Sequence, residues 1–228
     1  MYQEYFSYYL ELERDFFSTE IYLTIDEDNY GAFSIQYNRI YQSICSEIDC
    51  LLKELCKQLK PEAKARKLGA YCPIIQSHFK YFKDERVYLY KSRIELQPWK
   101  EWGENKAPFW WTMYNNVKHH RMEIDEKTEK PYYKYANLEN VLNALAALFI
   151  VEQYYIYNYD FHESVIEEFA KKYSCDVKEG IKKAKSQMMI DCVSKRMEIK
   201  GWNKFKSYFA GYTHYDIDKL GEYIKNRD

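Results

Sequence analysis

The sequence has few of the residues that interrupt helices, because only 7 Gly and 5 Pro occur among its 228 residues. Both residue types are disfavoured inside helices, so their scarcity predicts a mainly α-helical protein. The few glycines are scattered, and no Gly-rich phosphate-binding loop is formed. The G-x-S-x-G and H-E-x-x-H motifs are also missing, so nothing indicates serine-hydrolase or zinc-protease chemistry.

Paired cysteines, a signal peptide and a long apolar run are missing as well. None of the six cysteines has C-x-x-C spacing, so the sequence gives no support for a zinc or thioredoxin-like site. The N-terminus lacks the basic and apolar regions of a signal peptide. The longest apolar run, Ala144–Val151, is too short to span a bilayer. We therefore expect a cytoplasmic protein with reduced thiols and no membrane segment.

Charged residues make up 30% of the chain and hydrophobic residues 46%, which is typical of a soluble protein with a core. The net charge of −1 conceals a basic segment, Lys171–Lys206, that holds 11 Lys/Arg and 4 Asp/Glu. Such a segment is either a solvated helix face or a surface for a polyanion such as RNA. The second interpretation predicts salt-sensitive RNA binding.

Three segments have the apolar periodicity of helices. The clearest runs from Phe33 to Leu59, about 25 residues, and should end near Pro61. A second covers Tyr5–Phe17. The third, Leu138–Tyr157, is apolar nearly all round and follows Asn137, a suitable N-cap. It is therefore expected to be the central buried helix.

Other segments depart from helical periodicity. The short β-prone runs Val87–Tyr90 and Ile94–Leu96 predict a small hairpin, which we interpret as a flap at about residues 85–97. An extended run is expected at Ile21–Ile25. The stretch Pro61–Tyr71 is basic and is expected to end in a turn at Gly69, and Glu123–Lys134 is expected to be a polar loop.

The composition becomes basic and aromatic-rich after residue 158. Two helices are predicted there, His162–Tyr173 and Val177–Val193, followed by aromatic residues that could pack on the body. We therefore place a helical bundle at residues 1–158 and a C-terminal helical extension at residues 159–228.

The stretch Pro108–Arg121 concentrates the side chains with reactive chemistry. Pro108 suits a first helical position, and a helix is expected from Trp110 to about His120. Residues three and four apart share a helix face. One face is expected to enter the core and comprises Trp110, Met113 and Val117; the other comprises Trp111, Asn115, Lys118 and His119.

His119 is the candidate proton-transfer group of this stretch, and Asn115 lies one turn before it. Attack of a ribose 2′-hydroxyl on the adjacent phosphate needs proton transfer and a cation, which Lys118 or Arg121 could supply, but no metal ion. His119 and His120 are adjacent, so they diverge by about 100° on a helix and cannot share a metal ion.

A purely structural role for these residues is the alternative. The central helix carries a strip of small or polar residues, namely Ala136, Asn140, Asn143, Ala144 and Ala147. Buried Asn side chains need hydrogen-bond partners, and the face formed by Asn115 and His119 is the obvious candidate.

The order of these helices and their residues resembles the HEPN superfamily. The family motif is Arg, then Asn, Asp or His, then a few residues and His; Asn115 and His119 match it, while Tyr114 stands at the position of the Arg. The stretches Trp110–Arg121 and Ala136–Phe149 are also similar to a group of uncharacterised bacterial HEPN-like proteins. Tyr, unlike Arg, has no fixed positive charge with which to hold a phosphate.

The resemblance implies an antiparallel helical bundle that dimerises and joins two motifs in one cleft. Members of the family include metal-independent endoribonucleases of toxin–antitoxin and phage-defence systems, and RNA-binding forms without activity. No metal or cofactor is implied; the partners implied are RNA, an antitoxin or defence-system protein, and a second copy. The candidate site comprises His119 and Asn115 as catalytic residues; Lys118, Arg121, His120 and Tyr114 as phosphate or RNA contacts; and Asn140, Asn143 and Trp111 as supporting residues.

Overall fold

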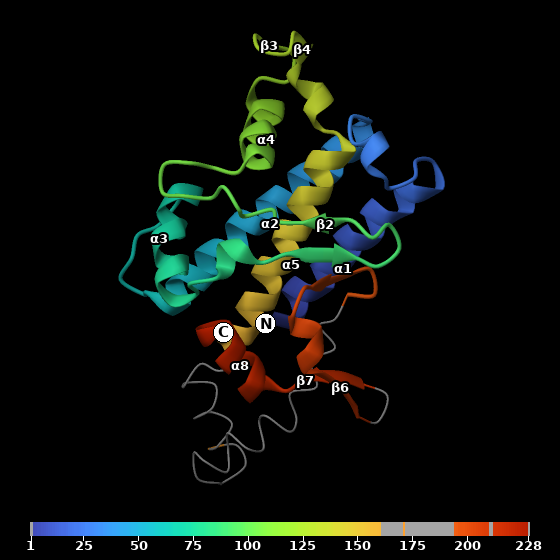
Figure 1. The fold of residues 1–228 in the computed structure, drawn as a ribbon. Coiled ribbons are helices and arrows are strands. Elements are labelled where there is room, and N and C mark those ends of the chain that lie inside the picture. Colours follow the sequence, from blue (N-terminus) through green and yellow to red (C-terminus); the bar gives the residue numbers. More distant parts are fainter. Residues whose placement is uncertain (1, 161–170, 172–193, 210–211, 228) are drawn as a thin grey trace.

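The structure is a computed structural model that describes residues 2–160, 171, 194–209 and 212–227. These residues are mainly helical, with small antiparallel sheets (Figure 1). The expected fold class is confirmed to that extent. The two helices predicted between residues 162 and 193 lie outside the described residues, as does most of the basic segment Lys171–Lys206.

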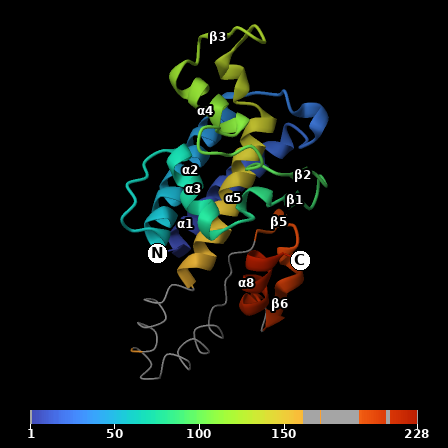
Figure 2. The same ribbon diagram turned by 60° about the vertical axis from the view of Figure 1, so that its left-hand side comes forward.

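Three long helices form the body of the protein: α1 (Tyr2–Ser18), α2 (Ile35–Leu59) and α5 (Leu138–Asp160). Helix α5 packs against both of the others and is buried almost all round (Figures 1 and 2). This confirms its predicted central position. Within the described part of the chain, no helix is long and apolar enough to cross a membrane.

Side chains at the starts of α2 and α5 satisfy backbone groups that would otherwise lack partners. The Oγ of Ser34 accepts a hydrogen bond of 3.0 Å from the backbone N–H of Tyr37. The Oδ1 of Asn137 accepts one of 3.0 Å from the backbone N–H of Asn140, which confirms the predicted N-cap. The long apolar stripe of α2 is buried, and its predicted length and end are also confirmed.

Helix α3 (Leu68–His78) occupies a region where a turn at Gly69 was expected, and that prediction is wrong. Gly69 lies in the first turn of this helix. There it packs against the backbone of Glu104, in the segment before α4. A Cβ atom at this position would lie 2.3 Å from the carbonyl oxygen of Glu104. The glycine therefore permits a close approach of two backbones and does not end a helix.

The predicted hairpin is present as β1 (Val87–Leu89) and β2 (Glu95–Leu96), which pair antiparallel. A third strand, β5 (Met197–Ile199), pairs with the other edge of β1, with Tyr88 opposite Glu198. The sheet order is β2-β1-β5, so the chain after residue 158 contributes to the sheet. The division of the chain at residue 158 stays a prediction.

The expectation of an extended run at Ile21–Ile25 is wrong, because the 3-10 helix η1 (Thr19–Ile21) leads into a turn. The expected polar loop Glu123–Lys134 also contains a short hairpin of β3 (Ile124–Asp125) and β4 (Lys130–Pro131). The remaining 3-10 helices are η2 (Glu27–Asn29), η3 (Phe82–Asp84), η4 (Tyr132–Tyr135) and η5 (Trp202–Phe205).

The described C-terminal residues form strands β6 (Lys206–Phe209) and β7 (Tyr212–Tyr215) and helix α8 (Ile217–Asn226). They lie at the end of the bundle opposite the β3–β4 hairpin (Figure 2). Trp202 is buried there and its ring centroid lies 5.2 Å from that of Tyr154 on α5. Its indole N–H donates to the buried carboxylate of Glu85 at 3.3 Å. The expectation that C-terminal aromatic residues pack on the body is thereby confirmed for Trp202.

Candidate functional site

Helix α4 (Phe109–His119) carries the candidate site and is anchored at its first turn. The indole N–H of Trp110 donates to the carbonyl of Pro98 at 2.8 Å, and the hydroxyl of Tyr41 on α2 donates to the carbonyl of Trp110. Pro108 precedes the helix as its N-cap and is not its first residue. The expected core face of Trp110, Met113 and Val117 is buried, as predicted.

Tyr114, at the position of the motif Arg, is buried inside the bundle and is only 5% exposed. Its ring packs edge-to-face on Tyr41, with 5.8 Å between the centroids, and also contacts Trp111. Burial, with a smaller effect of the Cys45 thiol, raises the pKa of Tyr114, so the phenol stays neutral at physiological pH. Only a small part of this side chain is therefore open to a ligand.

Lys118 lies beside Tyr114. Its Nζ lies 5.5 Å from the centroid of the Tyr114 ring, a distance at which a cation is attracted to a ring face. The two residues are one turn apart on α4, and Lys118 is exposed whereas Tyr114 is not. A positive charge therefore lies close to the motif position, although a different residue carries it.

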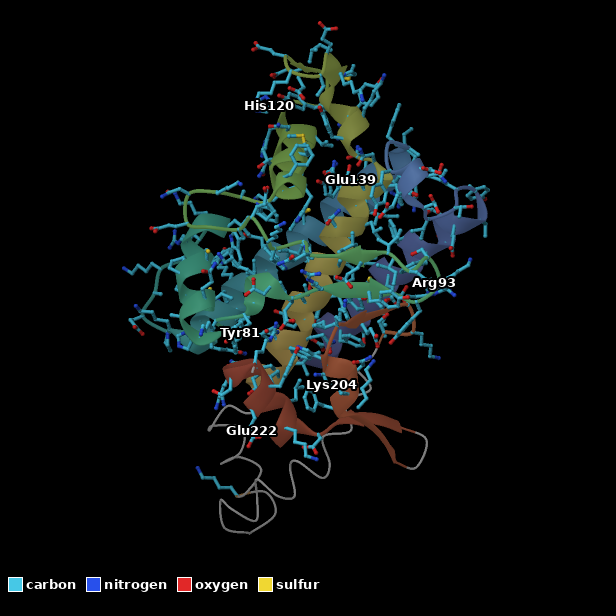
Figure 3. The ribbon with its side chains drawn as sticks, in the orientation of Figure 1. Tyr81, Arg93, His120, Glu139, Lys204 and Glu222 are labelled. Carbon is cyan, nitrogen blue, oxygen red and sulfur yellow. The ribbon has the colours of Figure 1, made fainter. Side chains whose placement is uncertain are left out.

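The end of α4 presents consecutive basic or titratable side chains to solvent, namely Lys118, His119, His120 and Arg121. The Nδ1 of His120 lies 2.9 Å from the Oε1 of Glu123 (His120 is labelled in Figure 3). Among the described residues, no hydrogen bond or ion pair engages the side chains of His119 and Arg121. These two side chains are available to a ligand.

The three candidate Asn residues each bond to a nearby backbone carbonyl. Asn115 donates to Trp111 at 3.1 Å, Asn140 donates to Tyr135 at 2.9 Å, and Asn143 donates to Glu139 at 2.9 Å. Across the described residues, no hydrogen bond joins Asn115 to His119 or to the two Asn residues of α5. The predicted hydrogen-bonded bridge between the two helices is therefore not formed.

The β3–β4 hairpin continues the surface beyond α4 and was missed in the sequence. The carboxylate of Asp125 accepts hydrogen bonds from the hydroxyls of Thr128, at 2.8 Å, and Tyr135. These hydrogen bonds lower the pKa of Asp125. Residues 118–134 contain five Lys/Arg and four Asp/Glu. Two of the cations, Lys118 and Arg121, lie at the helix end, whereas the other three are interspersed with or follow the four acidic residues.

The described residues contain no group of three or more His, Cys, Asp or Glu side chains placed to hold a metal ion. The ring centroids of His119 and His120 are 6.4 Å apart, and each ring belongs to a different face of the helix end. The chemistry open to this surface is proton transfer by His119 and phosphate binding by Lys118 and Arg121.

No protein-family model matches the sequence, and no similar curated protein or solved structure was found. The described residues show a mainly helical architecture with small antiparallel sheets.

Proposed function

We propose that this chain is a HEPN-like, RNA-acting protein of a bacterial defence or toxin–antitoxin system, and that RNA binds at the exposed end of α4. The observation that carries the proposal is the cluster of Lys118, His119 and Arg121, which are exposed at one helix end. The side chains of Lys and Arg bind phosphates, and contacts to phosphates dominate affinity for nucleic acids.

Metal-independent cleavage is the more specific form of this function, and the exposure of His119 favours it. In such a reaction the 2′-hydroxyl loses its proton, its oxygen attacks the adjacent phosphorus, and a 2′,3′-cyclic phosphate forms. The bond to the 5′-oxygen breaks, and that oxygen takes up a proton as it leaves. His119 of one chain would accept the first proton and His119 of a second copy would donate the other, while Lys118 and Arg121 stabilise the charged phosphate.

A non-catalytic RNA- or protein-binding module is the alternative, and the environment of Tyr114 and Asn115 favours it. Tyr114 is buried where a catalytic member of the family has Arg. Asn115 bonds to the backbone of its own helix and does not orient His119. If this alternative holds, the end of α4 binds RNA or a protein, and the protein does not cleave RNA.

Cleavage is tested by incubating the purified protein with RNA in EDTA. For the catalytic function we expect cleavage, and His119→Ala should slow it at least about a hundredfold, as expected for loss of a general acid or base. The matched control is His78→Ala, because His78 is exposed on α3. If RNA stays intact at high protein concentration, the catalytic function is excluded. If the Lys118→Ala/Arg121→Ala variant also loses RNA binding, the non-catalytic alternative is the one that remains.

A further inference from the structure

A hollow of about 580 Å³ lies on a different part of the molecule, between the second half of α2 and the connection to α3. This connection runs along the outer side of both helices (Figures 1 and 2). The walls include Asp49, Lys53 and Lys57 of α2, Lys64 and Arg66 of the connection, and Tyr71 of α3. The volume lies in the range of about 300–1,000 Å³ that small-molecule sites occupy.

Four cations and one carboxylate line this hollow. Lys53 and Lys57 are four residues apart, so they share a face of α2. Lys57 pairs with Glu54 at 2.5 Å, but Lys53, Lys64 and Arg66 form no ion pair within the described residues. These three unpaired cations attract anions. Arg66 in addition has a planar guanidinium group that can form two parallel hydrogen bonds to a phosphate.

The acidic side chain in the hollow is already engaged. The hydroxyl of Tyr71 donates to the Oδ1 of Asp49 at 3.2 Å, and the Tyr71 ring is fully buried. Burial, followed by the charge of Asp49, raises the pKa of Tyr71, so this hydroxyl keeps its proton. The carboxylate retains lone pairs that can accept a hydroxyl of a sugar, while the lysines hold negative groups.

The connection allows a ligand to come close to the backbone. Ala63 and Ala65, which alternate with Lys64 and Arg66, have side chains of a single methyl group. In the described structure, the backbone N–H groups of Lys64, Ala65 and Arg66 donate no hydrogen bond to another backbone group. They are further donors for phosphate oxygens in the same segment as two of the cations.

We propose that this hollow binds a phosphorylated ligand of nucleotide size, with the phosphates held by Lys53, Lys64 and Arg66 and a sugar hydroxyl held by Asp49. The site is separate from the end of α4 and does not depend on the function proposed for it. Pro61, Ala63 and Ala65 are the accessible apolar residues of its wall.

The test is calorimetric titration of the full chain with ATP, tripolyphosphate and adenosine at physiological ionic strength. We expect saturable binding of ATP and tripolyphosphate and none of adenosine. Lys53→Ala/Arg66→Ala should weaken ATP binding at least about tenfold, because it removes two charged hydrogen-bond donors. The matched control is Lys60→Ala/Lys67→Ala, since these exposed lysines of the same region do not line the hollow.

Equal ATP affinity in the Lys53→Ala/Arg66→Ala variant and the wild type would overturn the proposal, as would an equal loss in the control variant. Failure of ATP to bind would overturn it too. A short single-stranded RNA without terminal phosphates provides the last arm. If that RNA bound through Lys53 and Arg66 while ATP did not, the hollow would be an RNA contact and the proposal would be wrong. Circular dichroism and melting temperatures verify that each variant is folded.

Discussion

Glu152 is a fully buried carboxylic acid in the central helix, and neither of its oxygens has a hydrogen-bond partner among the residues that the structure describes. Burial raises its pKa well above the usual value, and the carboxylate of Glu47 on α2 adds to the rise. The folded protein therefore holds this proton more tightly than the unfolded chain does. Stability from this group is highest below the unfolded pKa of about 4.3 and falls as the pH rises above it.

Replacement of Glu152 by Gln should stabilise the protein at neutral pH. We expect the free energy of unfolding to rise by about 1 kcal/mol or more at pH 7, because the neutral Gln amide removes the cost of protonating or desolvating a buried carboxylate. The gain should shrink toward pH 4, and urea titrations across this pH range measure it. Glu62→Gln, at an exposed position, is the control and should change little. Destabilisation by Glu152→Gln at pH 7 would contradict this account.

Individual residues of α4 were only partly predictable. Trp110, Met113 and Val117 were assigned correctly to the core because three- and four-residue steps define a helix face. Tyr114 completes the same stripe, since Trp110, Tyr114 and Val117 are also separated by four and three residues. The burial of its ring was not predicted, because the family motif assigns this position to a phosphate-binding Arg.

At the scale of elements, helix α3 contains a glycine, Gly69, at which the sequence predicted a turn. Gly69→Ala should destabilise the protein by about 1–3 kcal/mol, because the new Cβ would overlap the carbonyl of Glu104. Helix propensity alone predicts the opposite, a gain of about 1 kcal/mol. Thermal unfolding distinguishes the two signs. Gly31→Ala is the control, because nothing lies within 4 Å of a Cβ there. A higher melting temperature for Gly69→Ala would show that the close contact is absent.

The boundaries of α2 and α5 were predictable because the signals are local: apolar periodicity, a capping side chain and a following Pro. The turn at Gly69 was mispredicted because the contact with Glu104 is set by tertiary packing. Strand β5 could not be assigned either, because its partner lies more than a hundred residues earlier in the chain. The basic hollow was only partly predictable from the sequence. The sequence showed that Pro61–Tyr71 is basic, but it did not show that this segment forms a hollow with α2.

At the scale of the whole molecule, Trp202 joins the C-terminal residues to the bundle. Trp202→Ala should cost about 3–5 kcal/mol, because it empties a packed aromatic site beside Tyr154 and removes a donor from Glu85. The unfolding midpoint in urea is the measurement. Tyr22→Ala provides a comparison at a position that is 87% exposed, where little change is expected. A change below about 0.5 kcal/mol for Trp202→Ala would mean that this contact does not stabilise the fold.

The central claim is that the end of α4 contacts RNA phosphates, and the salt dependence of RNA affinity tests it most directly. Lys118→Ala/Arg121→Ala should reduce the slope of log K against log salt by about 1.4, because each phosphate contact on a single strand contributes ~0.7. Lys127→Ala/Lys130→Ala, on the neighbouring hairpin, is the charge-matched control and should leave the slope unchanged. An unchanged slope in Lys118→Ala/Arg121→Ala would contradict the account.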